Sequence, residues 1–79
     1  MGDVYQRLLG AASSLDPGQW TKDARIEAQA VIRCASCGGI DGLGAEHEIG
    51  LDGRVVPAWR CPTVTCGNVS WLWLEAWRP

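Results

Sequence analysis

Four cysteines, arranged as two close pairs, are the residues of this chain whose type and spacing best suit a defined chemistry. Cys34 and Cys37 enclose two residues, Cys61 and Cys66 enclose four, and 23 residues separate the pairs. Two turns that each supply two thiolates suit tetrahedral zinc. A glycine follows the second cysteine of each pair, which eases a turn that points N–H groups at the thiolates. The sequence therefore predicts one structural Zn²⁺ on these four cysteines.

Two disulfides, or four unrelated buried thiols, are the alternatives to a metal site. A two-residue spacer is unfavourable for a relaxed disulfide, and the βαβ context of redox-active pairs is missing from the pattern. Iron in a rubredoxin-like site is a variant, but a closed sulfur tetrahedron without a redox context favours zinc. His47 is a further candidate ligand. Because four cysteines already close a structural site, we expect His47 to be an ordinary hairpin residue.

An enzyme would need a nucleophile, a base or a metal-bound water with supporting groups. The chain offers one histidine and scattered carboxylates. We therefore expect no catalytic residues and no enzymatic activity.

The length and charge of the chain restrict its class and its partners. A chain of 79 residues makes one small domain, in which a metal commonly supplements a limited core. The formal net charge is -2, and four thiolates around Zn²⁺ would add a net charge of about -2. This is not the basic surface typical of nucleic-acid binding. We therefore expect a protein partner rather than bare DNA.

Residues 1–9 lack the basic head and apolar run of a secretory signal, and no apolar stretch has the length of a membrane span. We therefore expect no secretion by a signal peptide and no membrane partner. The predicted location is inside a cell.

The elements expected to position the cysteines begin with an amphipathic helix over residues 3–15, which ends at the turn 16–18. Residues 24–33 alternate apolar and polar side chains, which favours a strand. The sequence thus predicts an N-terminal helix and turn over residues 1–23. It predicts a metal-stabilised zinc ribbon, with rubredoxin-like β-hairpins and a Cys₄ site, over residues 24–79.

A β-hairpin is expected between the two cysteine pairs. Asp52-Gly53 lies between two apolar runs, and this dipeptide favours a type I′ turn because both central residues need positive φ. Leu51 should then face Arg54, and Ile49 should face Val56.

Five tryptophans are unusual in so short a chain, and large aromatic side chains can fill a small core. Trp71, Trp73 and Trp77 fall on one face of a last strand predicted over residues 69–77. A three-stranded ribbon cannot easily cover both faces, so we expect one face to meet the N-terminal helix. The other should bind a partner or stack on bases. Tryptophan and arginine dominate many interfaces, so the candidate partner-binding residues are Trp71, Trp73, Trp77 and Arg78.

The order of these motifs resembles the Ogr/Delta-type phage late-transcription activators. That family has a two-residue cysteine pair, a hairpin-length interval and a four-residue pair before an aromatic or β-branched strand. The pairs Cys34 to Cys37 and Cys61 to Cys66, followed by Val69 to Leu74, match this order in the second half of the chain. The resemblance implies a phage or prophage zinc-finger protein that binds DNA upstream of late promoters and contacts host RNA polymerase. It also implies that the four cysteines are the zinc ligands, and that the protein is located in the cytoplasm of a bacterial host cell or in a virion.

Two functions follow as hypotheses. The first is a zinc-ribbon binding module in transcription regulation, with nucleic acid or RNA polymerase as its contact. The second is a structural or assembly protein, either a virion component or a subunit adaptor, that docks through the Trp-rich strand by protein–protein interaction. Virion subunits would then be the partners, and self-association would use the same strand.

Overall fold

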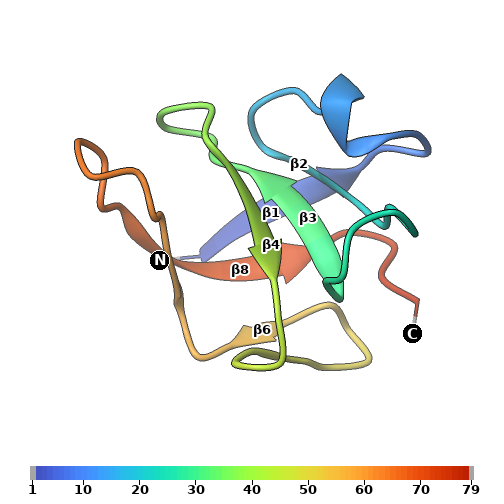
Figure 1. Ribbon diagram of the computed structural model, residues 1–79. Coiled ribbons are helices and arrows are strands. Elements are labelled where there is room, and N and C mark those ends of the chain that lie inside the picture. Colours follow the sequence, from blue (N-terminus) through green and yellow to red (C-terminus); the bar gives the residue numbers. More distant parts are fainter. Residues whose placement is uncertain (1, 79) are drawn as a thin grey trace.

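The computed structural model describes residues 2–78, and strands dominate this range (Figure 1). One sheet has the strand order β4-β3-β2-β1-β8-β7, and β5 and β6 form a separate hairpin. The elements are β1 (Gly2–Arg7), the 3-10 helix η1 (Ala12–Ser14), β2 (Gln19–Thr21), β3 (Ala30–Arg33), β4 (Ile40–Leu43), β5 (Glu48–Ile49), β6 (Val55–Val56), β7 (Trp59–Arg60) and β8 (Val69–Leu74).

β1 lies in the middle of the six-stranded sheet and runs parallel to both of its neighbours, β2 and β8. Val4 pairs with Trp73 and Tyr5 pairs with Leu74. Tyr5 and Leu74 are each 1% exposed, whereas Val4 is 64% exposed. Alternate residues of β1 and β8 therefore point into the core and out to solvent.

The predicted helix over residues 3–15 is wrong, because this segment forms β1 and then only the short turn Ala12–Ser14. Of the apolar positions that fit a helical stripe, Val4 and Tyr5 lie in β1, where Tyr5 is buried, while Ala12 and Leu15 are buried beyond the strand. In the strand, the backbone of β1 gains hydrogen-bonded partners on both sides, and this tertiary pairing outweighs a weak local preference.

The strand predicted over residues 24–33 forms only at Ala30–Arg33. The residues before it make turns fixed by Asp23, whose backbone carbonyl accepts a hydrogen bond from the Ile26 N–H at 2.9 Å. The Asp23 carboxylate accepts bonds from the N–H groups of Ala12 at 3.1 Å and Arg25 at 3.0 Å. This short acidic side chain therefore favours a turn over an extended ladder.

The hairpin around Asp52-Gly53 forms, but Ile49 pairs with Val55 rather than with Val56. Gly53 has a φ of +87°, and its N–H donates to the Gly50 carbonyl at 2.9 Å. Gly53 is thus the left-handed last residue of the four-residue turn 50–53, and this turn shifts the register by one. A Cβ at Gly53 would lie 2.2 Å from the Leu74 carbonyl oxygen, so this turn packs directly on β8.

The core lies on the inner side of the curled sheet, and the β5–β6 hairpin packs below β8 in Figure 1. The two edge strands also approach each other, because the indole N–H of Trp59 on β7 donates to the carboxylate of Asp41 on β4 at 2.8 Å. The buried side chains of this core are Tyr5, Trp20, Ala30, Ile32, Cys34, Leu43, Val55, Trp59, Cys61, Leu72 and Leu74. Within residues 2–78, no helix has both the length and the apolar character of a membrane span.

Candidate metal centre

The four predicted cysteines lie together, with their Sγ atoms all within 4.8 Å of one another. The Sγ atoms of Cys34 and Cys66 are 4.0 Å apart, and those of Cys37 and Cys61 are 3.5 Å apart. Four sulfurs at about 2.3 Å from one zinc ion stand about 3.8 Å from one another in a tetrahedron. All four are free thiols, so the disulfide alternative does not describe this arrangement. The cluster could hold a metal ion.

The first pair lies in the turn between β3 and β4, which we call the first knuckle (residues 34–39). The Cys34 N–H donates to the Gly39 carbonyl, and the Gly38 N–H donates to the Cys34 carbonyl, both at 2.8 Å. Gly38 has a φ of +76°, and the Gly39 N–H lies 3.4 Å from the Sγ of Cys37. The predicted role of glycine is confirmed here, because the left-handed residue turns an N–H toward a sulfur.

The second pair lies in the turn between β7 and β8, which we call the second knuckle (residues 61–68). The Cys61 N–H donates to the Asn68 carbonyl at 2.8 Å, and the N–H of Gly67, whose φ is +56°, donates to the Thr63 carbonyl at 3.0 Å. The Thr63 hydroxyl lies 3.5 Å from the Sγ of Cys37. The knuckles therefore touch through a polar contact as well as through the sulfurs.

Two residues that the sequence did not single out support the first knuckle. The Tyr5 hydroxyl accepts a hydrogen bond from the Ala35 N–H at 3.0 Å, which ties β1 to the knuckle. The Arg33 guanidinium donates to the Gly38 carbonyl at 2.8 Å and to the Leu15 carbonyl at 2.6 Å. Burial raises the pKa of Tyr5, so this hydroxyl stays neutral. Tyr5 is remote in sequence, and only the position of Arg33 beside Cys34 offered a local signal.

The four thiols differ in how readily they ionise without a metal. A hydrogen bond with the Thr63 hydroxyl, followed by one from the Gly39 N–H, lowers the pKa of Cys37 to about 6. The Asn68 N–H lowers the pKa of Cys66, but burial and hydrogen bonds with the other thiols outweigh it and raise that pKa to about 11. A metal ion would favour the thiolate at every position and release the remaining protons.

The four candidate partner-binding residues do not lie on one strand face. Trp71 is 42% exposed on β8, and Trp73 is half-buried on the same strand. β8 ends at Leu74, and Trp77 turns back so that its ring lies 5.5 Å from that of Trp20. The predicted strand over residues 69–77 is thus too long, since the left-handed backbone of Ala76 ends the extended run. The Arg78 side chain is exposed.

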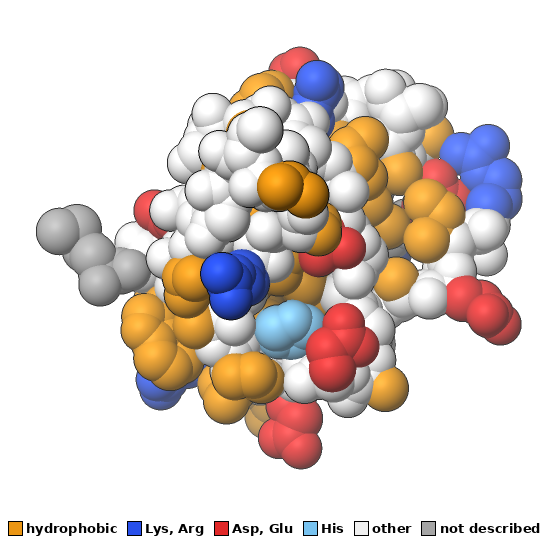
Figure 2. Space-filling model, turned by 60° about the vertical axis from the view of Figure 1, so that its left-hand side comes forward, with side chains coloured by type: hydrophobic (Ala, Val, Ile, Leu, Met, Phe, Trp, Pro, Cys, Tyr) orange, Lys and Arg blue, Asp and Glu red, His pale blue; other side chains and the backbone are white. Residues whose placement is uncertain are grey.

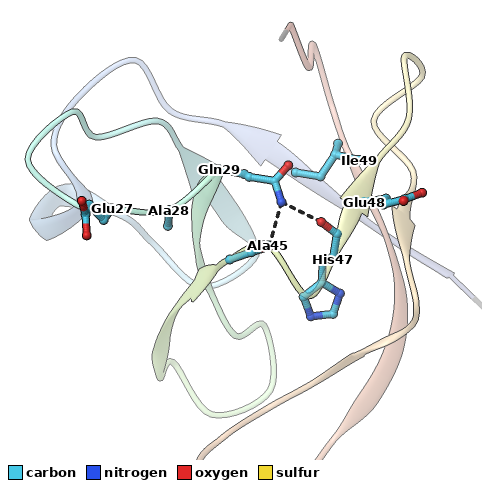
Figure 3. Close-up of a pocket in the computed structure, with 8 residues that line it drawn as sticks. Glu27, Ala28, Gln29, Ala45, His47, Glu48 and Ile49 are labelled. Carbon is cyan, nitrogen blue, oxygen red and sulfur yellow. Dashed lines mark hydrogen bonds between the residues drawn. The ribbon is translucent and has the colours of Figure 1, made fainter.

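His47 lies apart from the sulfurs, in an open groove that Figure 3 shows in close-up. Its Nδ1 is 3.1 Å from the Pro57 carbonyl oxygen, and its own carbonyl accepts a hydrogen bond from the Gln29 amide at 2.6 Å. Figure 2 shows the imidazole at the surface beside acidic side chains. In the part of the chain that the structure describes, the four cysteines are the only group of three or more potential ligands close enough to share a metal.

Comparison of the chain with family models, with curated proteins and with solved structures gave no match. The metal-site assignment therefore rests on the geometry of the sulfurs and the two knuckles. The resemblance to the Ogr/Delta-type activators stays a prediction from the cysteine spacing.

Proposed function

We propose that the chain is a non-enzymatic binding module of the zinc-ribbon type, whose fold is held by one structural zinc ion. The observation that carries this proposal is the convergence of four thiols within 4.8 Å of one another, from two turns that each direct an N–H group at a sulfur. Thiolates on four sides of an ion leave no open position for a substrate, which favours a structural role over a catalytic one. Zinc is favoured over iron because it needs no redox partner.

The position of the knuckles in the sheet supports a role for zinc as a fastener. The first knuckle joins the edge strand β4 to β3, and the second joins the opposite edge strand β7 to β8. An ion on Cys34, Cys37, Cys61 and Cys66 would thus tie the two ends of one six-stranded sheet. A domain with a small core gains much stability from such a metal link, because the metal would bring together the ends of the segment between Cys37 and Cys61.

Metal analysis of the full chain tests the proposal. Near-stoichiometric zinc in cleanly purified protein, and loss of the β-sheet circular dichroism on chelation, are the expected results. Cys66→Ser should abolish both the bound zinc and the β-sheet signal. Ser36→Ala, an exposed change within the first knuckle, should keep both. Purified protein that contains no metal, or that keeps its β-sheet signal after chelation, would overturn the proposal.

We further propose that the module acts by docking on protein, because Trp71 is exposed on a sheet whose chain carries a net charge of -2. Transcription, through RNA polymerase, and assembly, through virion subunits or a subunit adaptor role, are the two settings predicted from the sequence. Capture of partners from a host lysate with and without nuclease distinguishes direct protein contacts from contacts made through nucleic acid.

A further inference from the structure

The outer side of β1, β7 and β8 carries an exposed row of apolar side chains with an arginine at each end. On the left of Figure 2, hydrophobic side chains gather between basic ones. Along β8, Val69 is 59% exposed and Trp71 is 42% exposed, while the alternate residues Ser70, Leu72 and Leu74 are buried. We call this surface the aromatic face, and its residues are Val4, Arg54, Arg60, Val69, Trp71 and Trp73.

The aromatic rings of this face are held in place by their neighbours. A Cβ at Gly2 would lie 2.1 Å from the ring of Trp73, so that ring covers the glycine backbone of β1. The Arg54 guanidinium carbon lies 5.7 Å from the ring centroids of both Trp71 and Trp73. Cation–π attraction holds the Arg54 side chain near the two rings before any ligand arrives, which reduces the entropy lost on binding.

The two arginines have a defined separation along β8. Arg60 pairs with Val69, and Arg54 forms a bridge with Trp73, four residues further along the strand. Four residues of extended chain span about 13 Å. Within residues 2–78, the one ion pair joins Arg25 to Asp23, so neither arginine of this face has a carboxylate partner. The face therefore presents two arginines outside that ion pair, with apolar surface between them. The Asp52 carboxylate lies next to Arg54, where it accepts the Arg54 backbone N–H at 3.0 Å.

We propose that the aromatic face binds an extended acidic segment of a partner protein. Two of its carboxylates, four residues apart, would contact Arg54 and Arg60, and an apolar side chain between them would cover Trp71. The planar N–H edge of a guanidinium matches a carboxylate with two parallel hydrogen bonds. This assignment deepens the proposed docking function and rests on it.

The same face is less suited to nucleic acid or to a second copy of this chain. Two arginines on a chain of net charge -2 neutralise few phosphates. A symmetric dimer would bring the same patch against itself and oppose cation to cation. An acidic protein segment is the occupant whose charge complements the face.

Selection from a displayed library of random twelve-residue peptides, with the zinc-loaded full chain as target, tests the proposal. Enriched peptides should carry Asp or Glu at positions four apart, with an apolar residue midway. Arg54→Gln and Arg60→Gln should each weaken binding of a synthetic enriched peptide by about tenfold or more. Arg25→Gln, which makes the same charge change away from the face, should weaken it by less than about twofold.

The proposal would be overturned if the selection enriches no acidic peptides, or if Arg25→Gln and both face variants bind the peptide equally. It would also be overturned if oligo(dT), or self-association of the chain, displaces the peptide. Zinc content and circular dichroism of each variant separate a lost contact from a lost fold. Zinc-loaded, folded protein that enriches no acidic peptide contradicts the docking assignment alone. Folded protein without metal contradicts the proposed metal centre, and its peptide selection still decides the docking assignment.

Discussion

Tyr5→Phe tests whether β1 holds the first knuckle in place. The substitution keeps the buried ring, which is 1% exposed, and removes only the hydroxyl that accepts the Ala35 N–H at 3.0 Å. The tie between β1 and the turn that carries Cys34 and Cys37 is then lost. No other hydrogen bond to the Ala35 N–H occurs in the described part of the chain.

The magnitude follows from one neutral hydrogen bond and one donor left without its partner. A typical bond contributes about 1 kcal/mol, and the partly buried N–H of Ala35 adds up to about 1 kcal/mol when water replaces the hydroxyl incompletely. The free energy of unfolding should fall by about 1–2 kcal/mol. Because the lost hydrogen bond destabilises the metal-bound, folded state, zinc affinity should also fall, by up to about tenfold.

Urea unfolding of the zinc-loaded protein, with competitive zinc titration against a chromophoric chelator, measures both quantities. Gln6→Thr, an exposed change on the same strand, is the control and should stay within about 0.5 kcal/mol of the parent. Unchanged unfolding energy and unchanged zinc affinity in Tyr5→Phe would refute the idea that this hydroxyl supports the site.

Three further predictions test separate contacts. Gly53→Ala should lower the free energy of unfolding by more than about 2 kcal/mol, because its Cβ would meet the Leu74 carbonyl at 2.2 Å in a left-handed backbone; thermal melts check this. Thr63→Val should raise the pKa of Cys37 from about 6, so protons should compete better with zinc for this thiolate; competitive zinc titration at neutral pH should show a lower affinity. His47→Ala should leave the zinc content unchanged in elemental analysis, and metal loss would contradict the four-cysteine assignment.

The metal cluster was predictable because its signal is local. Each cysteine pair lies within one turn, and a glycine with positive φ follows both Cys37 and Cys66. The spacing of the cysteines therefore predicted which sulfurs could bind one metal ion. The strands on either side of each turn hold the two cysteines of that pair in place. The wider ribbon architecture is a proposal, since eight strands and a central parallel β1 exceed a simple pair of hairpins.

The N-terminal strand was not predictable from local pattern alone. Val4 and Tyr5 suit a helical stripe as well as a strand, and the choice depends on β8, which pairs with β1 from the other end of the chain. The support of the first knuckle by Tyr5 depends on the same pairing. The one-residue shift at Ile49 has a different cause, because only Gly53 of the expected turn pair adopts positive φ.

The aromatic face and the candidate metal centre share strands, which links the two proposals physically. Arg60 directly precedes Cys61, and Val69 follows Asn68, whose carbonyl accepts the Cys61 N–H at 2.8 Å. Arg60 and Val69 are therefore the residue pair of β7 and β8 that lies directly next to the second knuckle. A metal that closes this knuckle would hold Arg60 in place relative to the apolar row, while the backbone bridge to Trp73 places Arg54 independently. Zinc would thus support the position of Arg60, while the register of both arginines along β8 sets their spacing and so the acidic segments that fit.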